Sequence, residues 1–310
     1  MYSIVEFPSE GATLRGRYYI HPDTSKPAPI IIMAYGFSCT ITGMVADNYA
    51  EAFHEAGFAV LLYDHRNFGI SGGEPRQEIN KWIQARGYRD AIDFVTTLPE
   101  IDSSRIAIWG DSMSGNEVLV VGALDERVSV VVAQVPAIGR TAPPLDPDGK
   151  LFEALRETFF HGDVNGTPET TTPRMPVVSF DQGSIPSQLT PLTAYRWFIE
   201  YGGRYGTGWE NWGTRVNPDT PVPLSAVLSA PYLKVPVLML ISPNDEMPGA
   251  NTEVARKAWD LTPEPKELVE VDGGHFGIVH YPSPLYDHSV SVQKDFLIRH
   301  LMKSTFVEAN

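Results

Sequence analysis

Hydrophobic residues occur along the chain in two patterns, one typical of buried strands and the other of helices. Continuous apolar runs, typical of strands covered on both faces, occupy residues 29–34, 57–63, 105–109, 128–135, 235–241 and 267–271. Residues 2–20 alternate enough to predict two further strands joined at residues 9–11. Helices are predicted near residues 45–56, 78–97, 113–124, 251–262 and 290–303. This alternation predicts an α/β fold with a mostly parallel, eight-stranded sheet and helices on both faces.

The stretch from residue 137 to residue 231 breaks this alternation. It holds many prolines and predicts helices near residues 149–160, 190–203 and 223–230, joined by long loops. Its separated aromatic residues include Phe152, Phe159, Phe160, Tyr195, Trp197, Phe198, Tyr201, Trp209 and Trp212. Long loops in a compact domain usually form a lid or a binding surface. We therefore predict a helical, aromatic-rich cap at 137–231, inserted after the sixth strand of a core domain of residues 1–136 and 232–310, with most of these aromatics forming the cap's own core.

One predicted strand turns abruptly into a predicted helix at Arg-Ile-Ala-Ile-Trp-Gly-Asp-Ser-Met-Ser-Gly, residues 105–115. A sharp turn of this kind crowds the positions two before and two after its apex, and with Ser112 at the apex these positions hold Gly110 and Ser114. Ser114 replaces the second glycine of the usual Gly-x-Ser-x-Gly pattern and is still small. Moving the apex to either neighbouring candidate would crowd Trp109 or Asn116 instead. We predict that Ser112 is a nucleophile held at positive φ.

A serine hydroxyl needs a base to remove its proton and an acid to orient that base. Among the histidines, His275 alone follows an apolar strand through a glycine-rich turn, while His280 and His288 are weaker candidates. The strand at 235–241 ends in the polar turn Ser-Pro-Asn-Asp-Glu-Met-Pro, which offers Asp245 first and Glu246 second as the acid. We predict a Ser112–His275–Asp245 triad.

Acyl transfer also requires backbone N–H groups that stabilise the oxyanion. We expect one from Met113, directly after the nucleophile, and the other from Phe37 in the loop after the strand at 29–34, with Tyr35 and Ser38 as aids. For the substrate pocket we expect Tyr35, Trp197, Phe198 and Trp209.

Composition and charge narrow the class of protein. The 310 residues are 43% hydrophobic and 20% charged, as in soluble globular proteins, and the net charge of -14 argues against a nucleic-acid or membrane partner. The N-terminus has no leader pattern and no stretch is apolar enough to span a bilayer, so we expect a cytoplasmic protein. A single cysteine, Cys39, excludes an internal disulfide and is expected to be a small buried side chain. We expect neither a metal nor another cofactor, and the sequence leaves a homodimer open.

The loop Asp64-His65-Arg66-Asn67 with the following glycines lacks the spacing of phosphate-binding motifs and is expected to support the site through hydrogen bonds. Serine after the fifth strand, acid after the seventh and histidine after the eighth follow the order of the α/β-hydrolase fold. Residues 63–76 and 105–115 resemble the dienelactone-hydrolase-related group, which includes fungal polyketide transferases and bacterial esterase-like hydrolases. The resemblance implies a serine acyl-enzyme mechanism. This chain has serine where dienelactone hydrolases proper have cysteine.

The sequence therefore predicts a serine hydrolase that cleaves a small to medium apolar carboxylic ester or thioester, with a small-molecule acyl substrate as its partner. One alternative is an acyltransferase that passes the acyl group to an alcohol or amine, as in polyketide transferases. Others are a non-catalytic small-molecule binding protein, which the intact set of three residues opposes, and a peptidase, which would need cap residues that recognise a free amine.

Overall fold

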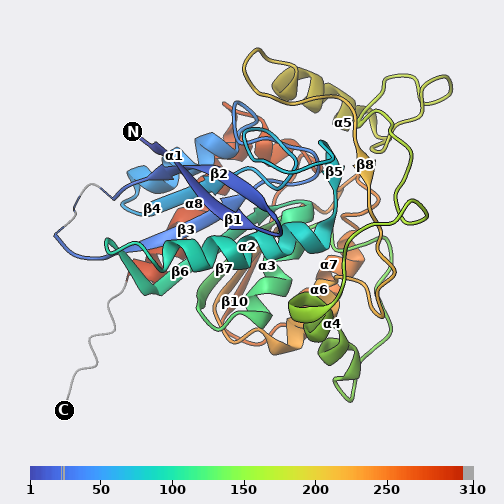
Figure 1. Cartoon of the computed structure of the whole chain (residues 1–310). Coiled ribbons are helices and arrows are strands. Elements are labelled where there is room, and N and C mark those ends of the chain that lie inside the picture. The colour runs from blue at the N-terminus through green and yellow to red at the C-terminus, as the bar shows by residue number, and fades with distance from the viewer. Residues whose placement is uncertain (22, 24, 303–310) are drawn as a thin grey trace.

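A single eight-stranded sheet runs through the computed structural model, which describes residues 1–21, 23 and 25–302 (Figure 1). In spatial order its strands are β1 (Ser3–Ser9), β2 (Ala12–Tyr19), β4 (Ala59–Tyr63), β3 (Ala28–Ala34), β6 (Ile101–Asp111), β7 (Val128–Gln134), β9 (Val237–Ile241) and β10 (Lys266–Glu270). Strand β2 pairs antiparallel with β1 and β4, whereas the strands from β4 to β10 are parallel. This strand order confirms the predicted α/β-hydrolase fold.

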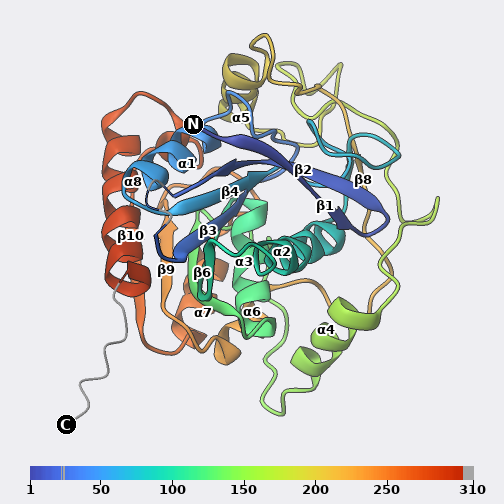
Figure 2. The same cartoon turned by 60° about the vertical axis from the view of Figure 1, so that its left-hand side comes forward.

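Helices cover both faces of the sheet (Figure 2). Helices α1 (Ala46–Glu55) and α8 (Pro284–Leu297) lie on one face, and α2 (Lys81–Val95), α3 (Met113–Leu124) and α7 (Thr252–Leu261) lie on the other. The apolar run of β3 shows why helices are needed on both faces of the sheet. Ile30 and Ile32 belong to the core beneath α2 and α3, while Ile31 and Met33 belong to the core beneath α1 and α8.

In two helices the first residue is set by the capping residue before it and not by the start of the apolar pattern. Helix α2 begins at Lys81 because the Asn80 side chain accepts hydrogen bonds from the backbone N–H groups of Trp82 and Ile83. Helix α8 begins at Pro284, earlier than the predicted 290, because Ser283 caps it and proline suits the first helical position. A π-helical turn, Ile298–Met302, follows α8. Residue 303, the last of the predicted helix, lies outside the described residues.

The segment between β7 and β9 divides into two parts that join different cores. It contains α4 (Lys150–His161), α5 (Leu192–Trp197), a π-helical turn (Phe198–Gly202), β8 (Thr214–Arg215), α6 (Ala226–Ser229) and a 3-10 turn (Ala230–Tyr232). Figure 1 shows α5 and α4 at opposite ends of the molecule. Phe152 and Phe159 of α4 join the core on the α2 side, whereas Trp197 and Phe198 join the core on the α1 side. The expected separate aromatic core is therefore absent from the described residues, and the domain boundaries at 137 and 231 stay a prediction.

A second, two-stranded sheet ties this segment to the rest of the chain. Strand β5 (Glu78–Ile79) pairs in parallel with β8, so that Ile79 lies opposite Arg215. The Val216 N–H donates to the Ile79 carbonyl at 2.8 Å. The pairing holds the cap segment against the start of α2.

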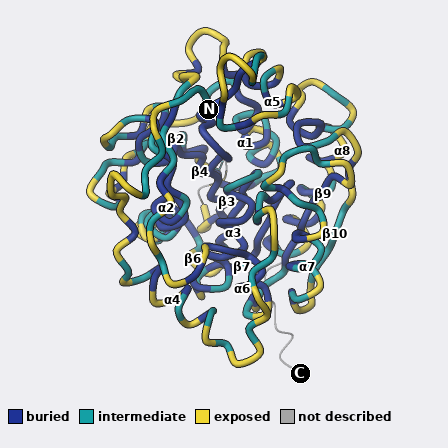
Figure 3. Tube along the Cα trace, turned by 90° about the vertical axis from the view of Figure 1, so that its right-hand side faces the viewer, coloured by how far each residue is buried: buried dark blue, intermediate teal, exposed yellow. Residues whose placement is uncertain are grey.

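The carboxyl ends of the central strands meet at one edge of the sheet. Gly110 of β6 pairs with Ala34 of β3 and Ala133 of β7. Because these strands are parallel, the loops that follow β3, β6, β7, β9 and β10 leave the sheet on the same side. Figure 3 shows the central strands, among them β3 and β7, as the buried centre of the molecule. Within the described part of the chain, no helix is long and apolar enough to cross a membrane.

Candidate active site

Ser112 occupies the tight turn between β6 and α3. Its φ is 54°, in the left-handed region that non-glycine residues rarely adopt, at a cost of about 1–3 kcal/mol. The Ser112 N–H donates to the Gln134 carbonyl at 2.9 Å, and the Ser112 carbonyl accepts from the Ala137 N–H at 2.7 Å. A Cβ on Gly110 would lie 2.2 Å from the Ser114 carbonyl oxygen, so a side chain cannot fit there. The structure therefore has the predicted apex and the predicted crowding.

His275 and Asp245 continue from Ser112 in a hydrogen-bonded series. Ser112 Oγ lies 2.9 Å from His275 Nε2, and His275 Nδ1 lies 2.7 Å from Asp245 Oδ2. The side chains of His275 and Asp245 are only 5% and 3% exposed. The other Asp245 oxygen accepts the Met247 N–H at 2.9 Å, so both carboxylate oxygens are fixed. This geometry sets the imidazole with its Nδ1 proton toward Asp245 and leaves Nε2 able to take the Ser112 proton.

Glu246, the second candidate acid, contacts the backbone of His275 rather than its ring. Glu246 Oε2 accepts the His275 N–H at 2.9 Å. A Cβ on Gly274 would lie 2.4 Å from the same oxygen, and Gly274 has a φ of 69°. Glu246 therefore holds the loop that presents His275, while Asp245 alone contacts the imidazole.

The acidic surroundings of His275 favour its protonated form. Burial by itself lowers the pKa of His275, but the hydrogen bond to Asp245 and the charges of Asp245, Asp111 and Glu246 outweigh it. The net effect raises the pKa of His275 above its ordinary value. An imidazolium formed when Ser112 loses its proton is thus stabilised where it forms.

Two residues of the pocket lining, Phe37 and Met113, carry the backbone N–H groups expected to stabilise the oxyanion. A Cβ on Gly36 would lie 2.9 Å from both the Asp111 carbonyl oxygen and Ser112 Cβ, so only glycine lets this loop approach the elbow. Phe37 and Met113 line the pocket. Neither of their N–H groups has a hydrogen-bond acceptor among the residues that the structure describes. The arrangement is suited to an oxyanion hole.

Ser114 does more than keep the turn uncrowded. Its buried Oγ lies 2.9 Å from each of three atoms: the Tyr35 carbonyl oxygen, His65 Nε2 and Glu117 Oε2. Tyr35 follows β3, His65 follows β4, and Glu117 belongs to α3. The hydroxyl thus joins the elbow to the loop that carries Phe37, and His65 supports the site as the Asp64–Asn67 loop was expected to do.

Burial favours the uncharged forms of both ionisable partners of Ser114. Burial lowers the pKa of His65 to about 3 and raises the pKa of Glu117 to about 8. A serine hydroxyl donates one hydrogen bond and accepts two. Ser114 therefore donates to the Tyr35 carbonyl and accepts from His65 Nε2–H and the protonated Glu117. The 3.7 Å approach of His65 to Glu117 is a contact between neutral groups.

A cavity of about 250 Å³ opens above Ser112. Of the residues expected to contact substrate, Tyr35, Trp197 and Phe198 line this cavity. Trp209 does not line it. Its ring packs instead on Phe198, with the ring centroids 5.4 Å apart, so it supports the wall from behind.

Three cationic side chains that sequence reasoning missed also line the cavity: Lys81, Arg140 and Arg215. The only carboxyl group in the lining, among the described residues, belongs to Asp111. Burial raises the pKa of Asp111 to about 6, and its Oδ1 accepts a hydrogen bond from Gln134 at 2.7 Å. Lys81 had one signal in the sequence, because a cation in the first turn of a helix opposes the helix dipole.

The remaining candidates lie outside the reacting centre. His280 and His288 are exposed and do not line the cavity. Ser38 is buried with a φ of 61°, also away from the cavity surface. Cys39 does line the cavity, but burial raises the pKa of its thiol well above the ordinary value, so it stays protonated. No group of histidine, cysteine and acidic residues in the described ranges could hold a metal ion.

Known proteins resemble this chain over nearly its whole length. It is 30% identical over 285 residues to a thiohydrolase of Eupenicillium brefeldianum, which covers 89% of this chain and 87% of the relative. It is 30% identical over 308 residues to the polyketide transferase grgF of a Penicillium species, and this match covers 96% of this chain and 97% of the relative. The crystal structure of the α/β hydrolase GrgF from Penicillium sp. sh18 matches with a TM-score of 0.72 at 28% identity, covering 98% of this chain and 100% of that chain. Residues 11–153 match the X-Pro dipeptidyl-peptidase (S15) family.

Proposed function

Because the chain belongs to the α/β-hydrolase family of the fungal thiohydrolases and polyketide transferases, we propose that it cleaves an acyl ester or thioester through an acyl-serine intermediate. The observation that supports this proposal is the hydrogen-bonded series from Ser112 through His275 to Asp245. Each member lies after the strand that the fold requires. Membership of a hydrolase-type family supports acyl cleavage in general. The hydrogen-bonded series supports a specific role for each of its three residues.

In this mechanism His275 Nε2 takes the proton of Ser112 as Oγ bonds to the acyl carbon. Asp245 holds the resulting imidazolium. When the tetrahedral intermediate collapses, the bond to the alcohol or thiol breaks, and His275 gives that leaving group its proton. Water then attacks the acyl-serine with His275 as the base, and the acid is released with Ser112 restored.

The negative charge of each tetrahedral intermediate falls on the former carbonyl oxygen. The free N–H groups of Phe37 and Met113 are placed to receive it. Each donor of this kind typically contributes about 10²–10³ in rate. Because Gly36 brings the Phe37 loop against the elbow before any substrate binds, this stabilisation needs no further rearrangement of the backbone.

The charge of the cavity speaks against a dipeptidyl-peptidase activity. Release of a dipeptide requires a group that binds the free ammonium at the start of a peptide. The lining instead contains Lys81, Arg140 and Arg215, which repel an ammonium, and a single carboxyl group in Asp111. The match of residues 11–153 to the S15 family therefore supports shared fold and serine chemistry more than shared substrate.

Acyl transfer to an alcohol or amine is the second candidate, favoured by the similarity to the Penicillium polyketide transferase. It shares every step up to the acyl-serine and differs only in the nucleophile that attacks next. Adding small alcohols and amines to the assay and identifying the products separates the two. If the free carboxylic acid is the only product, hydrolysis is supported. If an ester or amide of the added alcohol or amine forms at a low concentration of that nucleophile, acyl transfer is supported.

The test of the proposed nucleophile is labelling with a fluorophosphonate probe, read by intact mass and peptide mapping. We expect one adduct on Ser112, absent from Ser112→Ala and strongly slowed in His275→Ala. Ser114→Ala is the matched control because it removes the neighbouring hydroxyl, and it should still be labelled on Ser112. An unlabelled but folded wild-type protein would favour the non-catalytic binding protein instead.

A further inference from the structure

Two of the cationic side chains in the cavity lack a protein partner. Among the described residues, no hydrogen bond or ion pair joins the Lys81 ammonium or the Arg215 guanidinium to another group, and the Arg215 guanidinium only stacks on the Phe37 ring at 4.7 Å. Buried arginine is treated differently elsewhere in this protein. The Arg86 guanidinium donates to three carbonyl oxygens at the end of α4 and to Glu10. Lys81 and Arg215, which are half-buried, have no comparable set of acceptors among the described residues.

The backbone beneath these cations is held firmly. Arg215 lies on β8, opposite Ile79 of β5. On its other side the Arg215 N–H donates to the Thr172 hydroxyl at 2.8 Å, and its carbonyl accepts the Thr172 N–H at 2.9 Å. Lys81 lies two residues after the end of β5, at the start of α2. A two-stranded sheet thus places both side chains on the same wall, although they are far apart in sequence.

Gathering these cations is unfavourable without an anion. Burial lowers the pKa of Lys81, as does the charge of Arg215, while burial and the charge of Arg140 lower the pKa of Arg215. Among the described residues, Glu117 is the acid whose charge raises the pKa of Lys81, and burial raises the pKa of Glu117 itself to about 8, which favours its uncharged form. Lys81 also sits at the positive end of the α2 dipole. Among the described residues the two cations form no ion pair in this arrangement, so a bound anion is the natural counter-ion.

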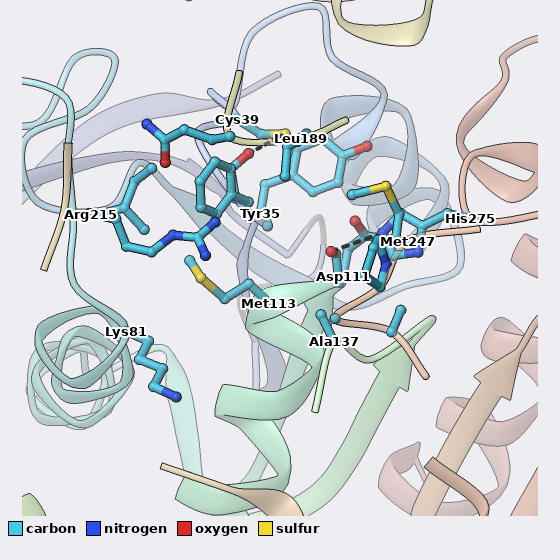
Figure 4. A pocket seen from close by; sticks show the side chains of 18 of the residues that line it. Tyr35, Cys39, Lys81, Asp111, Met113, Ala137, Leu189, Arg215, Met247 and His275 are labelled. Atoms are coloured by element: carbon cyan, nitrogen blue, oxygen red, sulfur yellow. Dashed lines mark hydrogen bonds between the residues drawn. The ribbon is translucent and has the colours of Figure 1, made fainter. Parts of the chain in front are cut away.

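The position of the cations indicates which part of a substrate would carry the anion. Figure 4 shows Lys81 and Arg215 on the opposite side of Met113 from His275. In the proposed mechanism His275 protonates the leaving group, so the leaving group lies on the His275 side. The acyl chain, attached to the same carbon, extends the other way, toward Lys81 and Arg215.

We propose that the enzyme acts on acyl donors whose chain ends in a carboxylate, that is, half esters or half thioesters of dicarboxylic acids, and that Arg215 and Lys81 bind this carboxylate. The inference rests on the proposed serine hydrolase function. The expected apolar substrate accounts for the side of the cavity formed by Trp197 and Phe198 and leaves the cationic wall unexplained.

The test compares half thioesters of glutaric, adipic and pimelic acids, with N-acetylcysteamine as the thiol, against neutral analogues in which an amide replaces the free carboxylate. Released thiol is measured and the enzyme-free rate is subtracted. We expect kcat/KM to favour the carboxylate by about 10- to 100-fold at the best chain length, the effect of one charge-assisted hydrogen bond. Equal or faster cleavage of the amides would overturn the proposal.

Variants identify the source of the preference. Arg215→Gln and Lys81→Gln should each lower the carboxylate-to-amide ratio while leaving the amide rate within a few-fold. Arg215→Lys keeps the charge and should keep part of the ratio. Arg196→Gln is the matched control, because Arg196 is an exposed cation of α5 outside the cavity, and its ratio should not change. If Arg215→Gln lowers both rates equally, Arg215 serves the scaffold or the oxyanion, which contradicts the proposal.

Two further arms separate this inference from the proposed function. Thioesters with a neutral acyl chain and an anionic thiol test whether the charge belongs to the leaving group, and a preference for these would refute the placement on the acyl chain. Thermal shifts of Ser112→Ala with adipate and with its neutral diamide, adipamide, report binding without turnover, and adipate alone should stabilise the protein. Normal fluorophosphonate labelling of Ser112 with no adipate shift would overturn the carboxylate site and spare the hydrolase.

Discussion

The adjacent acids Asp245 and Glu246 divide two tasks that sequence alone could not separate. Asp245 contacts the imidazole of His275, and Glu246 contacts its backbone N–H. We expect Asp245→Asn to lower kcat/KM by about 10³–10⁴-fold, because an amide donates to Nδ1 and forces the wrong imidazole tautomer. Glu246→Gln keeps an oxygen that accepts the backbone N–H and should stay within several-fold of wild type.

The comparison is made on variants with wild-type circular dichroism and melting temperature, since both side chains are part of ordered loops. Equal losses in the two variants would mean that loop position, and not the imidazole contact, sets the rate. A loss in Glu246→Gln alone would transfer the acid's role to Glu246.

At the scale of elements, the hydroxyl of Ser114 links the elbow, the loop after β3 and the loop after β4. Its partner Glu117 is buried in α3, and burial raises the pKa of Glu117 from 4.5 to about 8. The folded state therefore holds a proton that the unfolded state releases between these values. The contribution of Glu117 to stability is complete below pH 4.5 and is lost as the pH rises through about 8.

This linkage predicts a pH-dependent difference between wild type and Glu117→Gln, whose amide can replace the neutral acid as a donor to Ser114. Urea unfolding at several pH values should show wild type losing roughly 1.4 kcal/mol per pH unit relative to the variant between about pH 5 and pH 8. Subtracting the variant removes the contributions of other buried acids such as Asp64 and Asp111. Parallel stability curves would show that Glu117 is ionised in the fold.

Long apolar runs made the main elements predictable, because a strand buried on both faces has little room for polar residues. The tight turn at Ser112 was predictable for a related reason, since few residue types fit beside its apex. Strands β5 and β8 were not predictable, because a strand of two residues is too short to show an alternating pattern of apolar and polar positions. These short strands position Arg215 and Lys81. Because the sequence pattern did not predict the pairing of β5 with β8, it did not predict the cationic wall either.

At the scale of the whole molecule, the meeting of Ser112, His275 and Asp245 was predictable because parallel strands bring their carboxyl ends to one edge. Residues 112, 245 and 275 each follow a different strand, and the strand order alone places them together. The path of residues 137–231 was not predictable in this way. Its aromatic residues alternate too irregularly to show that α4 packs beside α2 while α5 packs near the His275 loop.

The net charge of -14 gives no information on the charge of the cavity. A total says nothing of where the charges lie, and most acidic side chains are on the surface, while Lys81, Arg140 and Arg215 face the cavity. An anionic substrate that the surface as a whole would repel can therefore still find a cationic site inside.

The central claim is that Ser112 carries the acyl group during turnover. Rapid acid quenching of the enzyme with an activated half thioester, followed by intact mass and peptide mapping, measures this directly. We expect a transient mass increase equal to the acyl group, located on Ser112 and absent from Ser112→Ala, which should also lose turnover. Steady turnover by a Ser112→Ala protein, or an acyl group mapped to another residue, would contradict it.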